Sequence, residues 1–575
     1  MKIAFVSAEV TPFSKTGGLA DVSGTLPPAL AALGHEVLVI TPLYASIDRT
    51  AHGLTLISTR GGIPGMGGTE IWEGRLGNAA RRSRVLFIGA AAFDRAGLYQ
   101  ENSRDYIDND ERFGFFSRAA LLLLKHLGFQ PDVIHAHDWQ AALIPVYLKT
   151  RYQDDEFFSR TGSILTIHNL VYQGVFEAAR WRSLGLPNHL FRMEALEFYG
   201  KINFLKGGII FSDVVTTVSP RYAREIQTRS FGAGLEGILY SRRHSLTGVL
   251  NGLDYDEWSP ACDANLFPPY DIRNLAGKSA AKKMLLEKMD MSAGDGNPDP
   301  PVMGCVTRLD PQKGCDILLR AMFQILPRTD SRLILLGSGA RDLETAFGNL
   351  ARAFPNKVRV NLKFDTELAK LIYAGSDFFL MPSKYEPCGL GQMIAMSYGT
   401  APVVRLTGGL ADTVKPWQAA AKQGNGFGFE SYTANALIGT LMKAFEAYRR
   451  PGVFRMIQTY AMQERFTWDR AARAYATLYG RAVYFRQKGG GGEMAVKAMK
   501  KAAEPVSLVY EIGENAGKVY QYLSDKSEAE SIAQIAKGAG LEVSVAAMAI
   551  GWLARENNVS VEKAGKNVQV RLIRR

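Results

Sequence analysis

The sequence predicts an α/β protein with two similar units and a small C-terminal domain. Short apolar runs, typical of buried strands, alternate with helical patterns over residues 1–245, and the same alternation restarts over residues 246–486. Strands separated by helices imply right-handed crossovers and parallel sheets. A length of 575 residues also favours about three domains, because a domain usually spans about 100–200 residues.

The first unit contains six apolar runs that we expect to be strands. They lie at residues 3–6, 37–40, 85–88, 133–134, 163–167 and 214–218. Helical patterns cover residues 20–33 and 111–127. This order predicts a parallel sheet with helices packed against it.

The second unit repeats this arrangement after Pro260. Its expected helix covers residues 315–326, and its expected strands lie at residues 302–306, 333–336, 358–361, 378–381 and 402–404. In open parallel sheets, ligands bind at the carboxyl ends of the strands. Two such units that face each other form a cleft, which is therefore the expected ligand site.

The rest of the chain is expected to be a separate domain. Four glycines at 489–492 have the composition of a flexible linker, which we expect over residues 487–505. Residues 506–575 then switch to three short helical patterns and a final strand-like run. Two helices around a glycine-containing turn, followed by a helix and a strand, predict a winged helix-turn-helix domain.

Composition narrows the class of protein and of partner. The net charge of +12 predicts an anionic partner. The tail from residue 493 contributes only +2 of this charge, and this weakens the interpretation that the partner is a nucleic acid. Four scattered cysteines are too few for a disulfide framework or a C-x-x-C zinc site. The N-terminus does not resemble a signal peptide, and no apolar run reaches the length of a membrane span. We therefore expect a cytoplasmic protein.

Two glycine-rich turns after expected strands are candidates for phosphate binding. Residues 15–18 (Lys-Thr-Gly-Gly) open a helix, so that backbone N–H groups and Lys15 can face an anion; the alternative is a tight turn with a solvated lysine. Residues 337–339 (Gly-Ser-Gly) are the second turn. The second turn is not a dinucleotide fingerprint, since Asp342 replaces the last glycine of G-x-G-x-x-G. A P-loop is also absent, because residues 276–279 (Ala-Gly-Lys-Ser) match only the end of that motif and Ile272 replaces its first glycine.

The second unit adds cations and a carboxylate at strand ends. Arg308 and Lys313 follow the strand at 302–306, where they could bind a diphosphate or remain solvated. Glu386 and Cys388 follow the strand at 378–381. Cys388 is either a nucleophile or a small packed residue, and packing is favoured because no histidine neighbours it in the sequence.

Histidines follow two strands of the first unit. Residues 135–139 (His-Ala-His-Asp-Trp) superficially resemble a metal cluster, but no matching third and fourth ligands accompany them. Contacts with a substrate at the strand end are the favoured interpretation. His168 lies just past another strand, where a structural role is the alternative to catalysis.

Seven ordered motifs resemble those of bacterial glycogen synthases and plant starch synthases. They lie at residues 15–21, 135–139, 166–170, 251–260, 307–314, 386–390 and 407–413. The resemblance covers about residues 1–485. It implies the GT-B fold, with two Rossmann-like units and a donor cleft between them. The implied reaction transfers glucose from ADP-glucose to the non-reducing end of an α-1,4-glucan with retention of configuration, and needs no metal or other cofactor.

The resemblance also assigns roles to single residues. The implied catalytic set is Asp138, His168, Arg308, Lys313 and Glu386. Among these, Arg308 and Lys313 match the diphosphate clamp. The implied donor-binding set is Lys15, Gly18, Asn251, Cys388, Gly389 and Leu390. Trp139 is expected to give an apolar face to the acceptor sugar, or else to pack in the core. One departure is Ile394, which stands where related transferases often have a second glutamate.

The tail resembles a small bacterial winged helix-turn-helix domain of unknown role. Its expected recognition helix, near residues 542–549, is almost uncharged, which favours packing or a protein partner over DNA. Two alternatives remain beside the glucan synthase. One is another GT-B transferase that uses UDP-glucose or a different acceptor, and the other is a DNA-binding regulator that acts through the tail.

Overall fold

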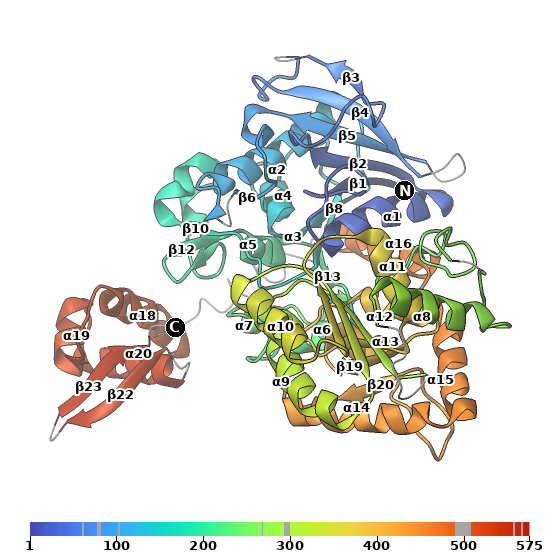
Figure 1. Ribbon diagram of the computed structural model, residues 1–575. Coiled ribbons are helices and arrows are strands. Elements are labelled where there is room, and N and C mark those ends of the chain that lie inside the picture. Colours follow the sequence, from blue (N-terminus) through green and yellow to red (C-terminus); the bar gives the residue numbers. More distant parts are fainter. Residues whose placement is uncertain are drawn as a thin grey trace.

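We describe a computed structural model of the chain over residues 1–59, 62–77, 82–101, 104–266, 268–291, 299–488, 508–555, 558–564 and 567–573. Two α/β units stand one above the other and a small domain lies beside them, which confirms the expected fold class (Figure 1). Of the linker expected over residues 487–505, residues 489–505 lie outside the described part of the chain.

The first unit is built on a nine-stranded sheet with the order β14-β13-β9-β8-β1-β2-β5-β4-β3. All six expected strands are present and pair in parallel, as β1 (Lys2–Val6), β2 (Glu36–Pro42), β5 (Ser83–Gly89), β8 (Val133–His137), β9 (Gly162–Ile167) and β13 (Val214–Thr217). An antiparallel hairpin of β3 (Thr55–Ser58) and β4 (Glu70–Leu76) extends one edge, and β14 (Leu246–Gly248) pairs in parallel with β13 at the other. β3 is mostly exposed and lacks an apolar run, which is why the sequence did not predict it.

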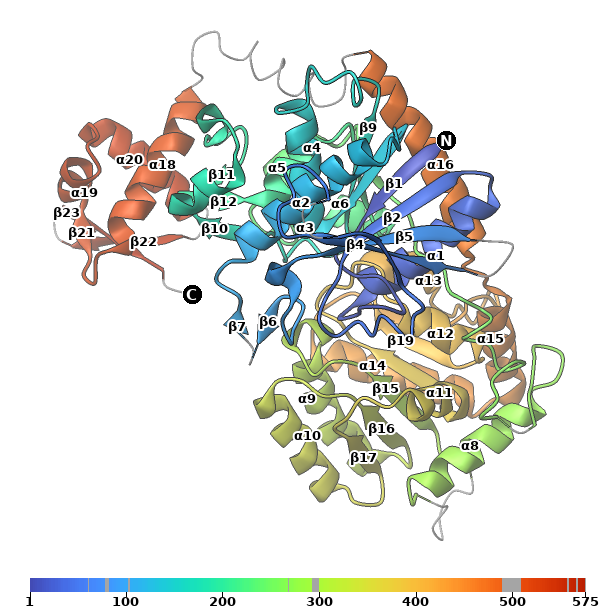
Figure 2. The ribbon, with the colours of Figure 1, turned by 90° about the horizontal axis from the view of Figure 1, so that it is seen from above.

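Helices α1 (Gly18–Ala32) and α2 (Asn109–His126) confirm the two expected helices of this unit. A further helix, α16 (Trp468–Gln487), carries the chain from the second unit back to the first (Figure 2). It packs against α1 and β9, and it buries Tyr475 and Tyr479 in the core of the first unit. The segment that leads from the first unit into the second and the segment that leads back are in contact, because the Leu253 N–H donates to the Phe466 carbonyl at 2.7 Å.

The second unit has a six-stranded, fully parallel sheet with the order β17-β16-β15-β18-β19-β20. The five expected strands are β15 (Val302–Val306), β16 (Arg332–Leu336), β17 (Val358–Asn361), β18 (Phe378–Met381) and β19 (Ala401–Arg405). β20 (Phe427–Phe429) was not predicted. One core lies under α9 (Cys315–Ile325), α10 (Arg341–Ala353) and α14 (Ala434–Tyr448). The other lies under α8 (Ala276–Lys288), α11 (Thr366–Gly375) and α12 (Gly391–Ser397), so both faces are covered and the central strands β15 and β18 are apolar throughout.

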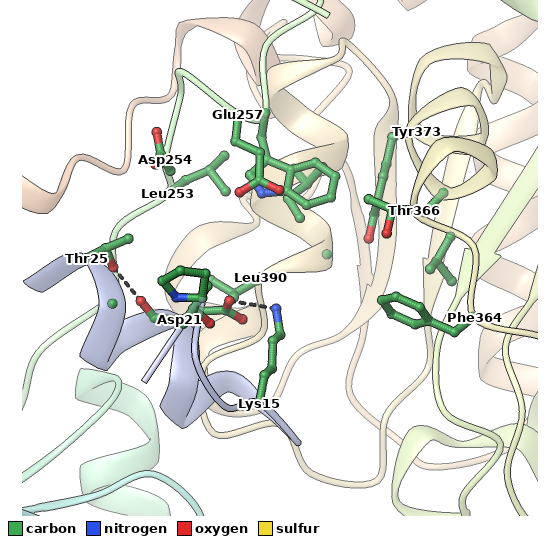
Figure 3. Close-up of a pocket in the computed structure, with 18 of the residues that line it drawn as sticks. Lys15, Asp21, Thr25, Leu253, Asp254, Glu257, Phe364, Thr366, Tyr373 and Leu390 are labelled. Atoms are coloured by element: carbon green, nitrogen blue, oxygen red, sulfur yellow. Dashed lines mark hydrogen bonds and ion pairs between the residues drawn. The ribbon is translucent and has the colours of Figure 1, made fainter. Parts of the chain in front are cut away.

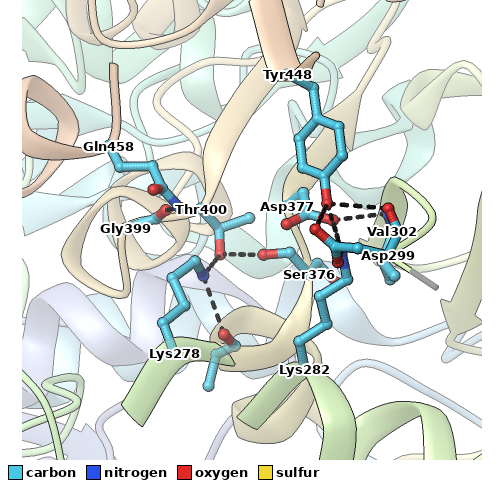
Figure 4. A network of polar contacts seen from close by, with 11 residues as sticks. Lys278, Lys282, Asp299, Val302, Ser376, Asp377, Gly399, Thr400, Tyr448 and Gln458 are labelled. Carbon is cyan, nitrogen blue, oxygen red and sulfur yellow. Dashed lines mark hydrogen bonds and ion pairs between the residues drawn. The ribbon is translucent and has the colours of Figure 1, made fainter. Parts of the chain in front are cut away.

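Two lysines of α8 bind neighbouring segments of this unit (Figure 4). Lys278 donates to the carbonyls of Ala374 and Tyr398 and to the Thr400 hydroxyl, at 2.9, 3.0 and 2.7 Å. Lys282 pairs with Asp377 at 2.8 Å. The sequence around Lys278 lacks the first glycine of a phosphate loop, and the structure gives this lysine a structural role. It binds the carboxyl-terminal end of α11, whose other end borders the cleft.

The small domain consists of α18 (Leu508–Ser524), α19 (Ile532–Gly538), α20 (Val543–Arg555) and an antiparallel sheet with the order β21-β23-β22. This is the winged helix-turn-helix arrangement, with β22 (Val559–Ala564) and β23 (Asn567–Leu572) as the wing and the short β21 (Glu530–Ser531) paired with β23. The ring of Tyr520 on α18 lies 6.3 Å from that of Tyr199, which follows β11 (Glu197–Phe198) of the first unit. Among the described helices none is by itself long and apolar enough to cross a membrane; only the bent pair α19 and α20 reaches that composition jointly.

Candidate active site

A cavity of about 690 Å³ lies between the two α/β units (Figure 3). It is bordered by loops that follow the carboxyl ends of β1, β15, β16 and β17, where parallel sheets usually bind ligands. Its first-unit wall includes Thr11, Lys15, Asp21, Gly24 and Thr25. Its second-unit wall includes Thr307, Arg308, Ser338, Phe364, Thr366 and Leu390. Of the sequence-predicted site residues, Lys15, Arg308 and Leu390 therefore line one cavity.

The loop of residues 15–18 is held by a buried carboxylate that the sequence analysis missed. Glu9 accepts the N–H groups of Thr16 and Gly17 at 2.5 and 3.2 Å, and the Thr16 hydroxyl at 2.6 Å. The Tyr99 hydroxyl donates to the same carboxylate at 2.8 Å. A lone acidic residue directly after a buried strand was the available signal.

This loop places Lys15 at the cavity and Gly18 at the start of α1. The Lys15 ammonium lies 2.6 Å from the Asp21 carboxylate, so it is paired across the first turn of the helix. An ideal Cβ on Gly18 would meet no atom within 4 Å, so the backbone there is open to a neighbouring group. The helix N-terminus adds positive potential on the same side.

Glu386 and Lys313 meet although 73 residues separate them, and neither is among the residues that line the cavity. The Lys313 ammonium contacts both Glu386 carboxylate oxygens, at 3.0 and 2.8 Å, and the Ser383 hydroxyl donates to one of them at 3.0 Å. Glu386 is only 5% exposed. The structure therefore joins Lys313 to Glu386, whereas Arg308 is exposed at the cavity wall.

The loop after Glu386 is shaped by its backbone. Cys388 is buried, and burial raises the pKa of its thiol to about 12, so the thiol stays protonated and acts as a packed residue. Gly389 has φ +76°, a conformation that favours glycine. The Gln392 side chain donates to the carbonyls of Cys388 and Gly389 at 3.2 and 3.0 Å. Leu390, which follows Gly389, lines the cavity and precedes α12.

The histidines of the first unit form a buried polar group behind this site. His168 Nε2 lies 2.9 Å from His137 Nδ1, and the His168 N–H donates to the Asp138 carboxylate at 2.7 Å. Burial lowers the pKa of His168 to about 3 and raises the pKa of Asp138 to about 7. The imidazoles of His137 and His168 are therefore both neutral at pH 7. Among the described residues, no group of three or more His, Cys, Asp or Glu could hold a metal ion.

Nine of the twelve sequence-predicted site residues are not among the residues that line this cavity: Gly18, Asp138, Trp139, His168, Asn251, Lys313, Glu386, Cys388 and Gly389. Of these, Trp139 and Asn251 lie in the interior. Trp139 is 9% exposed and packs against Phe113 and Phe176, with ring centroids 4.9 and 5.7 Å away. Trp139 thus packs in the core, which was the alternative to a contact with the acceptor sugar. Asn251 is buried as well. The following segment, residues 252–254, does line the cavity.

An exposed aromatic ring is the clearest site feature that the sequence analysis missed. Phe364 lines the cavity yet is 92% exposed, so one face of its ring is open to a ligand. Such rings stack on flat groups, nucleobases among them. Phe364 follows β17 and precedes α11, so the rule that ligands bind at strand ends was the signal available for it.

Family comparisons match three segments of the chain. Residues 2–241 match the starch synthase catalytic domain, and residues 290–455 match the glycosyl transferases group 1 family. Residues 506–572 match a winged helix-turn-helix domain, DUF2582.

Known relatives cover the body of the chain. The glycogen synthase of Syntrophotalea carbinolica is 45% identical over 486 residues, which is 84% of this chain and 99% of the relative. That of Thermotoga petrophila is 44% identical over 495 residues, with the same coverage. Among solved structures, the catalytic domain of starch synthase IV from Arabidopsis thaliana, bound to ADP and acarbose, is similar with a TM-score of 0.75 and 34% identity. It covers 84% of this chain, and the match spans 99% of that structure.

Proposed function

The chain belongs to the glycogen and starch synthase family of glucosyltransferases, and we propose that it transfers glucose from ADP-glucose to the non-reducing end of an α-1,4-glucan with retained configuration. The observation that carries this proposal is the cavity itself. In it, Lys15 of the candidate phosphate loop of one unit lines the same cavity as Arg308 and the open ring of Phe364 of the other.

The cations of the site suit a diphosphate leaving group. Cleavage of the sugar–phosphate bond leaves a sugar with positive character and a diphosphate of rising negative charge. Lys15, the N-terminus of α1 and Arg308 face the cavity from both units. Charges placed in advance at this position stabilise the transition state more than the ground state. Lys313 would join them by exchanging its bond to Glu386 for one to the diphosphate.

Phe364 would hold the base of the nucleotide. Its exposed ring stands on the second-unit wall, with Tyr373 deeper in the same wall. Stacking of a base on an aromatic side chain contributes about 1–3 kcal/mol. The ADP in the starch synthase IV structure supports an adenine nucleotide as the occupant.

Glu386 and the histidine group would act on the sugar. Glu386 is buried in the loop that brings Leu390 to the cavity, and we expect its carboxylate to orient a sugar hydroxyl or to stabilise the cationic centre. Neutral His168 can offer its backbone carbonyl or its ring to the glucose, and Asp138 fixes the backbone of His168. The free state of all four cysteines agrees with action in the cytoplasm, which we propose as its compartment.

A donor comparison tests the proposal. Purified protein is incubated with glycogen and either ADP-glucose or UDP-glucose, and nucleotide release and glucan length are measured with and without EDTA. We expect ADP release with chain lengthening, unaffected by EDTA, and weaker use of UDP-glucose. Phe364→Ala should raise KM for ADP-glucose about tenfold, whereas Phe364→Tyr should not. Inactivity of the folded protein with both donors would refute the proposal.

A further inference from the structure

Two short helices join the α/β units at a contact separate from the cavity. They are α6 (Pro220–Glu225) of the first unit and α13 (Gly408–Thr413) of the second, and they pack together where the units meet (Figure 1). Glu225 lies in this contact and is 7% exposed. One of its carboxylate oxygens accepts the Thr407 hydroxyl and the Gly408 N–H, both at 3.0 Å. The other accepts the Arg221 Nε–H at 2.9 Å.

The contact is reciprocal. The Asp412 carboxylate of the second unit accepts the Arg221 N–H in the first turn of α6, at 2.7 Å. Each helix therefore has its first turn capped by a carboxylate of the other unit. A carboxylate is favoured at a helix N-terminus, where free N–H groups point outward. A buried carboxylate that lost these donors would be strongly destabilised, so the contact requires one relative position of the units.

The same segment of the second unit lies against the loop that carries Glu386. The Gly409 N–H donates to the carbonyls of Glu386 and Pro387, both at 3.1 Å. An ideal Cβ on Gly408 would lie 1.9 Å from the Glu386 carbonyl oxygen, so the two backbones touch. Glu225 therefore binds residues 407 and 408, and Gly409, the residue after them, binds the backbone of Glu386.

We propose that Glu225 is a positioning residue that fixes the Glu386 loop only while the two units are in contact. The proposal rests on the transferase activity proposed above. Approach of the units places the Glu225 carboxylate on residues 407–408, and Gly409 transmits that position to Glu386. A misplacement of a reacting group by about 1 Å can reduce the rate about a hundredfold. The contact would thus make a correct Glu386 position depend on correct docking of the units.

Three variants separate the bonds of Glu225. Glu225→Ala removes both bonds to the second unit. Glu225→Gln keeps them, because both end on a single oxygen that the amide can supply. Arg221→Ala removes only the bond within α6, since the backbone N–H that Asp412 accepts remains. Glu446→Ala is the matched control, because it removes an Arg–Glu pair of the same i,i+4 spacing on the exposed surface of α14.

The readouts are kcat, KM for ADP-glucose, Kd for ADP, Tm and hydrogen exchange of residues 384–392. For Glu225→Ala we expect kcat to fall about tenfold to a hundredfold and exchange to quicken, with the Kd for ADP nearly unchanged. Glu225→Gln, Arg221→Ala and Glu446→Ala should stay within about twofold of wild type.

Several results would overturn the proposal. They are a Glu225→Ala enzyme that is less stable but keeps its kcat, a Glu225→Gln enzyme as slow as Glu225→Ala, or unchanged exchange over residues 384–392. If the wild-type protein itself were inactive, the proposed transferase function would fail, and the exchange measurement would still decide whether Glu225 holds the loop.

Discussion

The cations that face the donor site differ in how they are engaged. Lys15 is paired with Asp21, and Lys313 is paired with Glu386. Within the described residues, no carboxylate forms an ion pair with Arg308. An incoming diphosphate would compete with two carboxylates for the lysines but would meet Arg308 without such competition. Arg308 is therefore expected to make the first contact, and Lys313 to follow as it leaves Glu386.

Loss of either clamp cation should slow the reaction strongly. For Arg308→Ala and Lys313→Ala we expect kcat/KM to fall about a hundredfold to a thousandfold, because each removes a charge aimed at the leaving diphosphate. Steady-state kinetics with ADP-glucose provide the measurement, and thermal unfolding checks the fold. Arg473→Ala, on the exposed face of α16, is the control. Near-wild-type kinetics for either variant would remove that residue from the clamp.

At the scale of elements, β8 and β9 create a buried polar layer in an otherwise apolar core. His135 on β8 bonds the Thr166 hydroxyl of β9 and the Tyr479 hydroxyl of α16, at 2.6 and 2.9 Å. His137 bonds His168 just past β9. Burial lowers the pKa of His135 and His137 well below the usual value for histidine. The layer thus links the sheet to the helix that returns from the second unit.

These neutral histidines should make the protein sensitive to acid. Unfolded histidines bind protons near pH 6.5 while His168 in the folded state does so near pH 3, so the contribution of His168 to stability is fully present above pH 6.5 and is lost as the pH falls towards 3. Carboxyls whose pKa burial raises act in the opposite sense; they are Asp138, with a pKa of about 7, and Glu257, Asp377 and Asp412. The histidine contribution is therefore measured by comparing variants. Each extra proton taken up on unfolding changes the free energy of unfolding by about 1.4 kcal/mol per pH unit.

Urea unfolding between pH 5 and 7 measures this dependence. We expect His137→Gln to flatten the slope, and His244→Gln, at an exposed position, to leave it unchanged. A His137→Gln protein with the same slope as the wild type would contradict the assignment of a neutral buried His137.

At the scale of the whole molecule, the winged helix domain stands beside the first unit without entering the cleft. Its helix α20 occupies the position of a recognition helix but has no charged side chain before Arg555. Val543 and Met548 on this helix are 56% and 36% exposed. Recognition helices for DNA carry Arg, Lys, Asn or Gln toward the base edges. The body, with its cations at the cleft, is the part suited to an anionic ligand.

The full-length protein is therefore expected not to bind DNA. In a gel-shift titration with duplex DNA at about 50 mM salt, where nonspecific contacts are strongest, we expect no retarded band at micromolar protein. ADP-glucose turnover of the same sample shows that the protein is folded. A band that weakens as salt rises would instead support the regulator alternative.

Local patterns were enough to predict the parallel strands of both units except β14 and β20. Eleven expected strands are present because most are short apolar runs, and burial of both faces of a parallel sheet selects such runs. Among the strands that were missed, β3 is exposed and β20 is only three residues long. The motif residues Lys15, Arg308 and Glu386 were found because they follow strands, where the fold class itself places ligands.

The sequence by itself determined the fold class, most strands and the candidate residues, since these depend on neighbours along the chain. Only the tertiary structure decided which residues meet. It paired Lys313 with Glu386, brought Glu9 to the loop of Lys15, buried Trp139, exposed Phe364 and returned α16 to the first unit. It also placed Glu225 against Gly408 across the units. Such partners lie far apart in the sequence, and their meeting depends on sheet order and on how the two units dock, which no local pattern encodes.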